Sequence, residues 1–93
     1  MTLNQILYFH SVAQCQNYHL AASKLNISQP SLSRAIANLE DELGIILFER
    51  KGRTVSLTKY GKIFLEHADR ILNDVKVAER QMEKLSGNAG HVD

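Results

Sequence analysis

The chain has 93 residues, 44% of them hydrophobic, and a formal net charge of +1. A chain of this length forms one small domain, and it holds no apolar run long enough to cross a bilayer. The N-terminus lacks the charged and then apolar pattern of a secretory signal, and the single cysteine excludes an internal disulfide. We therefore expect a cytoplasmic protein in which Cys15, near the end of a first helix, is a small buried residue rather than a nucleophile.

The low net charge conceals an uneven distribution of charged residues. The first 23 residues contain no Lys, Arg, Asp or Glu. Positions 50–62 contain no acidic residue and five basic ones: Arg50, Lys51, Arg53, Lys59 and Lys62. Because salt screens charge over about 8 to 10 Å, a local cluster of cations matters more for phosphate attraction than the total charge does. Nucleic acid therefore stays among the candidate partners.

Two predicted helices follow one another closely in the first half of the chain. A short, alanine-rich helix covers residues 20–25, and a tight turn around Asn26 separates it from a second helix at 28–43. Ser28 is suited to cap the second helix, Pro30 is tolerated in its first turn, and Gly44 ends it. Two helices joined by so tight a turn are typical of a helix-turn-helix unit.

The helix at 28–43 divides its residue types between two faces. The core face carries leucine and isoleucine at spacings of four, three and four: Leu32, Ile36, Leu39 and Leu43. The outer face and its flanks are small and polar with one cation: Pro30, Ser31, Ser33, Arg34, Ala37 and Asn38. Free N–H groups and the helix dipole favour a phosphate at the N-terminal end, whereas the acidic residues at 40–42 repel DNA. Any surface helix also has a polar outer face, so the pattern favours DNA binding only together with the preceding helix.

A short hairpin is predicted directly after the helix pair. An apolar stretch at 45–48 leads into a basic tip, and an alternating strand follows at 54–57. Gly52 supplies the freedom that a tight turn needs, and Arg50 and Arg53 lie on either side of it. A hairpin in this place is a wing, and arginine at its tip suits the narrow minor groove of DNA. A solvated surface loop is the alternative.

The rest of the chain predicts one long helix. Thr58 is a suitable N-cap, and the absence of proline up to Leu85 gives a length of roughly 40 Å. Apolar residues recur along it at alternating spacings of four and three, which is a heptad stripe: Phe64, Ala68, Ile71, Val75, Ala78, Met82 and Leu85. We expect this stripe to pair with a second copy, because so small a core cannot cover it. The alternative is a helix folded onto its own domain, for which Leu65 and Leu72 offer a second stripe.

Many of these positions belong to one ungapped pattern between Leu3 and about Leu85: Tyr8, Phe9, Val12, Ala13, Ala21, Ala22, Leu25, Ser28, Gln29, Pro30, Leu32, Ser33, Ile36, Leu39, Glu40, Leu43, Gly44, Leu47, Phe48, Arg50, Leu57, Thr58 and Gly61. In this pattern the chain resembles the N-terminal DNA-binding domain and linker helix of LysR-type transcriptional regulators. The resemblance implies a mainly α fold: a winged helix-turn-helix of three helices and a two-stranded wing, then a long dimerising linker helix.

The resemblance also implies a function and a set of partners. The protein would bind double-stranded DNA sequence-specifically as a homodimer, with helix 28–43 in the major groove and wing 50–53 at the minor groove. Gln29, Pro30 and Ser31 would lie in the major groove, Ser33 and Arg34 near backbone or bases, and Arg50 and Arg53 at the wing. We expect higher oligomers in a longer protein, and we expect no membrane partner.

The resemblance further implies how the chain is divided. Residues 1–58 would be the DNA-binding domain, 59–85 the linker helix, and 86–93, rich in glycine and small residues, a flexible hinge. An effector-binding domain, absent from this chain, would hold a small co-inducer, and we expect no cofactor here.

The chain departs from the family before the first helix of the pair. Gln16, Asn17, Tyr18 and His19 stand where relatives usually have Gly-Ser-Phe-Thr. Asn17 can still cap the helix and Tyr18 can still fill the aromatic site. His19 replaces a hydroxyl suited to contact phosphate, so it is either a pH-sensitive phosphate contact or an exposed residue without a role.

Two other classes of function were weighed against DNA binding. A protein-interaction module stays open, since winged helices and coiled coils also bind proteins. An enzyme is not expected, because the sequence has no nucleophile elbow and no glycine-rich phosphate loop, and its size leaves little room for a lined pocket. No metal site is expected either, since His10, His67 and His91 lack metal-ligand spacing.

Overall fold

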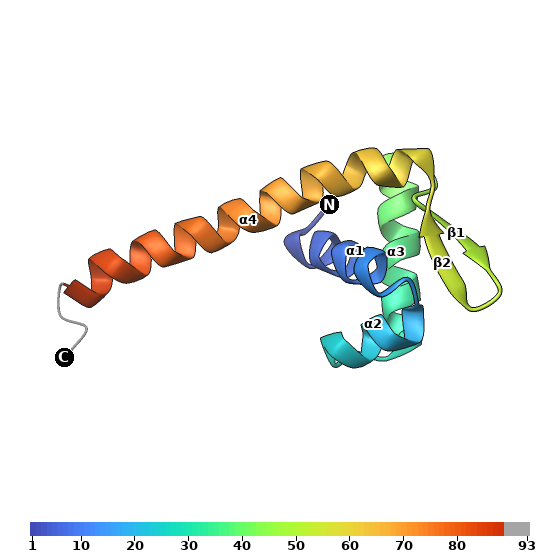
Figure 1. Ribbon diagram of the computed structural model, residues 1–93, viewed down its shortest axis with the longest axis horizontal. Coiled ribbons are helices and arrows are strands. Elements are labelled where there is room, and N and C mark those ends of the chain that lie inside the picture. Colours follow the sequence, from blue (N-terminus) through green and yellow to red (C-terminus); the bar gives the residue numbers. More distant parts are fainter. Residues whose placement is uncertain (89–93) are drawn as a thin grey trace.

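The computed structural model describes residues 1–88, and these form four helices and one two-stranded antiparallel sheet (Figure 1). In chain order the elements are α1 (Leu3–Cys15), α2 (Tyr18–Leu25), α3 (Gln29–Leu43), β1 (Phe48–Lys51), β2 (Thr54–Leu57) and α4 (Lys59–Asn88). The predicted fold class is confirmed: a winged helix-turn-helix precedes a long helix. That helix continues to Asn88 rather than ending at Leu85, so the predicted hinge does not begin at residue 86. Residues 89–93 of the predicted hinge, His91 among them, lie outside the described residues.

The helices begin and end at residues that satisfy their free backbone groups. Asn17 Oδ1 accepts from the Leu20 N–H at 2.7 Å, and Ser28 Oγ accepts from the Ser31 N–H at 3.1 Å. Asn26 and Gly44 end α2 and α3 in the left-handed conformation, at φ 58° and 73°. Gln16 adopts the same conformation after α1, with φ 56°, at the position where the family usually has glycine.

The core lies where α1, α3, the start of the wing and α4 meet. The Phe9 ring is at its centre, with centroids 5.1 Å from Phe48 of β1 and 4.8 Å from Phe64 of α4. Burying these aromatic rings together joins segments that lie far apart in the sequence. The buried side chains are Ile6, Phe9, Val12, Tyr18, Ala21, Ala22, Leu32, Ile36, Leu39, Leu47, Phe48, Val55 and Ala68.

The long helix α4 divides into two halves with different surroundings. Figure 1 shows it crossing the helical unit and then continuing away from it, which gives the molecule a long axis of 52 Å. In the first half, Ala68 is fully buried and Phe64 and Ile71 pack against the core of their own chain. In the second half, Met82 and Leu85 are 57% and 60% exposed. The second half therefore leaves its apolar side chains without cover in the single chain.

The prediction that the whole heptad stripe faces a second copy is therefore corrected for Phe64, Ala68 and Ile71. The physical reason is that an apolar stripe with spacings of four and three can pack against the chain's own core as well as against a second helix. The small core needs the first turns of α4 to cover it. A polar contact of 2.9 Å between His10 Nε2 and Asp69 Oδ1 also joins α1 to this half of α4. Val75, Ala78, Met82 and Leu85 are the part of the stripe that keeps exposed surface.

Gly61 allows α4 to approach the loop before the wing. A Cβ atom at this position would overlap the Leu47 carbonyl oxygen and lie 2.9 Å from Leu57 Cδ2. Backbone this close leaves no room for any side chain. Gly87, near the other end of the helix, has nothing within 4 Å of the corresponding point.

These two glycines give a matched test of the close approach. We expect Gly61→Ala to lower the free energy of unfolding by about 1 to 3 kcal/mol, because the loop must move to accept the methyl group. Gly87→Ala should raise it by up to about 1 kcal/mol, since alanine is the better helix former. Thermal and urea unfolding measure both. Equal stability of Gly61→Ala and the wild type would mean that helix and loop are not in contact.

Candidate nucleic-acid interface

The N-terminal end of α3 is the most open part of the helix-turn-helix unit. Gln29, Pro30 and Ser31 are all exposed in the first turn. The Ser28 hydroxyl donates to Ser31 Oγ at 2.8 Å while it accepts from the Ser31 N–H, so the two serines order the helix start. One turn further along, Arg34 is exposed and Ser33 is half-buried. The polar face predicted from the sequence is therefore available to a ligand.

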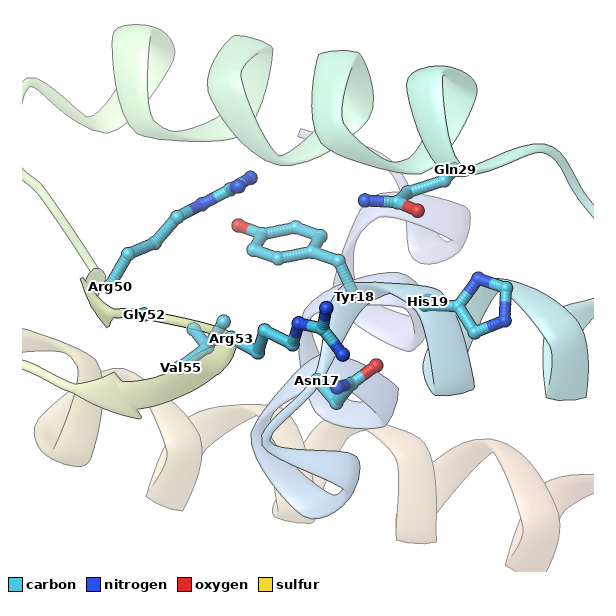
Figure 2. A pocket seen from close by; sticks show the side chains of 8 residues that line it. All are labelled: Asn17, Tyr18, His19, Gln29, Arg50, Gly52, Arg53 and Val55. Atoms are coloured by element: carbon cyan, nitrogen blue, oxygen red, sulfur yellow. The ribbon is translucent and has the colours of Figure 1, made fainter.

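A cavity of about 380 Å³ separates this helix end from the wing (Figure 2). Four of the predicted DNA-binding residues border it: His19, Gln29, Arg50 and Arg53. Its remaining lining comes from Asn17, Tyr18, Gly52 and Val55, so no described residue that lines it is acidic. Three separate elements thus direct cationic and polar side chains into one concave surface. The other predicted residues, at 30, 31, 33 and 34, lie on α3 outside the cavity.

The wing is a hairpin with its turn at Gly52 and Arg53. The register pairs Lys51 with Thr54 and Arg50 with Val55, and Gly52 has φ 63°. A glycine of positive φ at the first turn position, followed by a residue of ordinary φ, is the arrangement of a type II′ turn. Arg53 therefore lies at the tip, whereas Arg50 lies within β1 and not at the tip as the sequence alone suggested.

Arg50 lies over an aromatic ring from another element. Its Cζ atom is 4.3 Å from the ring centroid of Tyr18, the first residue of α2. Burial raises the pKa of the Tyr18 phenol above its usual value, and the neighbouring Arg50 cation opposes that shift. The sequence indicated Tyr18 only as the occupant of an aromatic site. The signal that links it to Arg50 is spatial, because 32 positions separate the two residues.

Glu40 attaches the start of the wing to α3. Its Oε2 atom accepts from the backbone N–H groups of Leu47 at 2.7 Å and Phe48 at 3.2 Å. A carboxylate that accepts two backbone N–H groups makes strong, charge-assisted hydrogen bonds. From the sequence alone, Glu40 was expected to have only an unfavourable role, as part of an acidic end that repels DNA.

Glu42, the last of the three acidic residues, also has a partner. Its carboxylate accepts from the N-terminal ammonium of Met1 at 2.6 Å and from the Gln5 amide at 3.2 Å. These hydrogen bonds, that of the ammonium first, hold the pKa of Glu42 below its usual value. The carboxylate therefore stays charged near neutral pH and keeps the chain start against the end of α3.

Two further backbone contacts hold the wing on its other side. The Val55 N–H donates to the Gln16 carbonyl at 3.0 Å, which joins β2 to the corner between α1 and α2. The Thr58 N–H donates to the Leu47 carbonyl at 2.9 Å, and the Thr58 hydroxyl donates to the Ile46 carbonyl at 2.7 Å. The wing is thus hydrogen-bonded to the helices on both strands, and its position relative to α3 is fixed.

Two other kinds of feature are absent from residues 1–88. No group of three or more His, Cys, Asp or Glu side chains there is placed to hold a metal ion. None of the four helices is both long enough and apolar enough to span a membrane.

Comparison with known proteins matched both the sequence and the fold. A family model described as "Bacterial regulatory helix-turn-helix protein, lysR family" matches residues 3–62. The uncharacterized HTH-type transcriptional regulator YybE of Bacillus subtilis is 40% identical over 85 residues, covering 91% of this chain and 29% of that protein. The HTH-type transcriptional regulator BenM of Acinetobacter baylyi is 47% identical over 75 residues, covering 81% of this chain and 25% of BenM.

A solved structure matches over nearly its whole length. The BenM DBD in its crystal structure with catB site 1 DNA superposes with a TM-score of 0.90 at 40% identity, covering 98% of each chain. By contrast, the chain spans about three-tenths of the length of the curated relatives it matches.

The Glu40 contacts predict a measurable loss of stability. Glu40→Ala leaves two backbone N–H groups without their acceptor, which should lower the free energy of unfolding by about 1 to 3 kcal/mol. Amide hydrogen exchange at Leu47 and Phe48 should become faster. Asp41→Ala, which removes the exposed neighbouring acid, is the control and should stay within about 0.5 kcal/mol of the wild type. Identical urea midpoints for the two variants would rule out this role of Glu40.

Proposed function

Because the chain belongs to the lysR family of bacterial regulatory helix-turn-helix proteins, we propose that it binds double-stranded DNA sequence-specifically, as the DNA-binding part of a dimeric transcriptional regulator. The observation that carries this proposal is the shared cavity, since the start of α3 and both wing arginines border one cationic surface. A helix and a wing held together in this way suit the grooves of one duplex. The likeness to a DNA-binding domain solved with DNA supports it.

In the proposed complex the N-terminal end of α3 enters the major groove. Gln29, Pro30 and Ser31 are exposed there and face the base edges, and Gln29 is suited to an adenine. Ser33 and Arg34, on the next part of the helix, contact backbone or bases. The positive end of the α3 dipole and the Gln29 N–H favour a phosphate, whereas Pro30 has no N–H and the Ser31 N–H is already bonded to Ser28. This end of α3 therefore supplies both base recognition and register.

The wing supplies the second attachment. Arg53 at the hairpin tip enters the minor groove, where the negative potential is concentrated. Arg50 in β1 adds a cation beside it, and His19 at the start of α2 contacts phosphate from the other side of the cavity. These contacts chiefly set affinity rather than sequence preference.

A second copy pairs through the outer half of α4. Val75, Ala78, Met82 and Leu85 form the part of the heptad stripe that the domain leaves exposed, and burying apolar surface drives such pairing. A symmetric dimer presents two recognition helices, so a partly palindromic site is expected, with half-sites about one helical turn apart in the simplest geometry. Higher oligomers would form in a longer protein.

The same proposal covers the other properties of the regulator. Its matched relatives are transcriptional regulators, and we propose that this chain likewise has no enzymatic activity and acts in the cytoplasm. Residues 1–58 read the DNA and α4 links them to an effector-binding domain. That domain, rather than this chain, would bind a small co-inducer.

Base recognition is tested by Gln29→Ala. Selection of bound sequences from a random pool of duplexes should give a defined site for the wild type. The variant should lose preference at one base pair of each half-site, worth about 1 to 3 kcal/mol, because a bidentate contact to that base is lost. Gln14→Ala, which removes an exposed glutamine of α1 away from α3 and the cavity, is the control and should leave the selected site unchanged. Failure of the wild type to enrich any sequence would contradict the proposed function.

Wing attachment is tested by Arg53→Ala. Affinity should fall for all sequences alike, and the slope of log K against log salt should become shallower by about 1, because one phosphate-neutralising cation is lost. Arg70→Ala on α4 removes an equally exposed arginine far from the cavity and should change neither quantity. Fluorescence anisotropy over a salt series measures both, and equal slopes for the two variants would place the wing away from DNA.

Dimerisation is tested by Met82→Lys. A charge placed in the apolar stripe should raise the dimer dissociation constant by about tenfold or more, since it would be buried without a partner. Glu83→Lys places the same side chain one position on, about 100° around α4 and outside the apolar stripe, and should leave association nearly unchanged. Sedimentation equilibrium distinguishes these outcomes. Dimers of equal strength in both variants would exclude this face of the helix.

A further inference from the structure

The cavity beside the wing contains a stacked pair whose role the proposed function leaves open. The Arg50 guanidinium lies 4.3 Å from the centre of the Tyr18 ring. Tyr18 itself is only 7% exposed, and its ring packs edge-on against Phe48, with centroids 6.2 Å apart and planes at 70°. The core therefore holds the ring in one orientation. Arg50 is exposed, whereas the Tyr18 ring beside it is held in place by the core.

The ring can attract the cation over the whole pH range of a DNA-binding experiment. Burial raises the pKa of the Tyr18 phenol from a value that is already about 10 in water, so the phenol stays neutral near pH 7. A neutral aromatic face carries a negative potential that favours a guanidinium placed over it. The Tyr18 ring is thus neutral near pH 7, and its attraction for the Arg50 guanidinium is the same across that pH range.

The place of Arg50 in the wing gives this contact a consequence. Arg50 pairs with Val55 in the middle of the hairpin, whereas Arg53 lies at the tip. Figure 2 shows the Arg50 side chain extending from β1 toward α3, with the Tyr18 ring beside it and Gln29 beyond. If α3 lies in the major groove and the tip in the minor groove, the strand between the grooves passes over this cavity. In that arrangement its phosphates come close to Arg50, and no described residue that lines the cavity is acidic.

We propose that Tyr18 is a positioning residue for DNA binding: it holds the Arg50 guanidinium between α3 and the wing, for contact with a phosphate of the strand that separates the two grooves. This inference rests on the proposed function. Arginine has a long side chain that loses much rotational freedom when it is fixed in a complex. An Arg50 side chain already stacked on Tyr18 has less rotational freedom to lose. Tyr18 therefore increases the affinity for DNA without contacting DNA itself.

A double-mutant cycle tests the inference on the wild type, Tyr18→Leu, Arg50→Ala and the double variant. The probe is a duplex that the wild-type protein selects from a random pool. We expect Tyr18→Leu to weaken binding by about two- to fivefold. In the Tyr18→Leu background, removing Arg50 should cost correspondingly less than in the wild type. Tyr18→Phe keeps the ring and should bind within twofold of the wild type.

The cycle separates this inference from the proposed function. If the two single effects multiply in the double variant, Tyr18 acts independently of Arg50 and the inference is wrong. The inference is also wrong if Arg50→Ala binds as tightly as the wild type while Gln29→Ala loses its base preference. If the wild type selects no sequence and neither Arg50→Ala nor Arg53→Ala changes affinity, the proposed function itself fails.

A measurement on the free protein keeps the test decisive if Tyr18→Leu unfolds. In the NMR spectrum, ring currents from Tyr18 should shift the side-chain protons of Arg50 upfield. The shift should persist in Tyr18→Phe. Arg50 protons at random-coil positions in the folded wild type would overturn the inference.

Discussion

The arrangement of this molecule depends on one carboxylate, that of Glu40, which accepts two backbone N–H groups at the start of the wing. Glu40 belongs to α3 itself, three turns after Gln29. The helix α3, whose first turn we propose to contact bases, and the wing, which carries the arginines, are therefore joined directly by hydrogen bonds. Hydrogen bonds to a charged acceptor are stronger than those to a neutral one, and a small domain has only about 5 to 15 kcal/mol of stability in all. A wing ordered in advance has little conformational entropy to lose when it meets a ligand.

The long helix α4 contributes to folding through its first half, and we propose that its second half mediates association. Its first half covers the core, where Phe64 meets Phe9 and Ala68 is fully buried. Its second half exposes Met82 and Leu85. The boundary expected at residue 58 thus does not separate two folding units, because residues 1–58 alone would expose the Phe9 cluster to water. Folding of the domain fixes the direction in which the outer half of the helix projects.

Regular patterns made most of the fold predictable. Spacing of apolar residues located α3 and α4, and Asn17, Ser28, Gly44 and Thr58 cap or end helices where the sequence placed them. Long-range contacts were not predictable in the same way. Nothing in the local sequence distinguishes Glu40, which binds the loop, from its exposed neighbour Asp41. Heptad spacing could not tell a core-facing position such as Ala68 from an outward one such as Met82. For the candidate site, residue types indicated the exposed polar positions, while the stacking of Arg50 on Tyr18 needed three dimensions.

The length of α4 has a mechanical consequence for any dimer built on it. Thirty residues make a rod of about 45 Å. A change of about 5° in the angle of such a rod moves its far end by about 4 Å, close to the rise of one base pair, about 3.4 Å. The distance between the two DNA-binding units of such a dimer therefore depends on how straight α4 is, although α4 lies outside the candidate interface. Small bends in α4 would therefore change the distance between the two DNA half-sites that a dimer can bind.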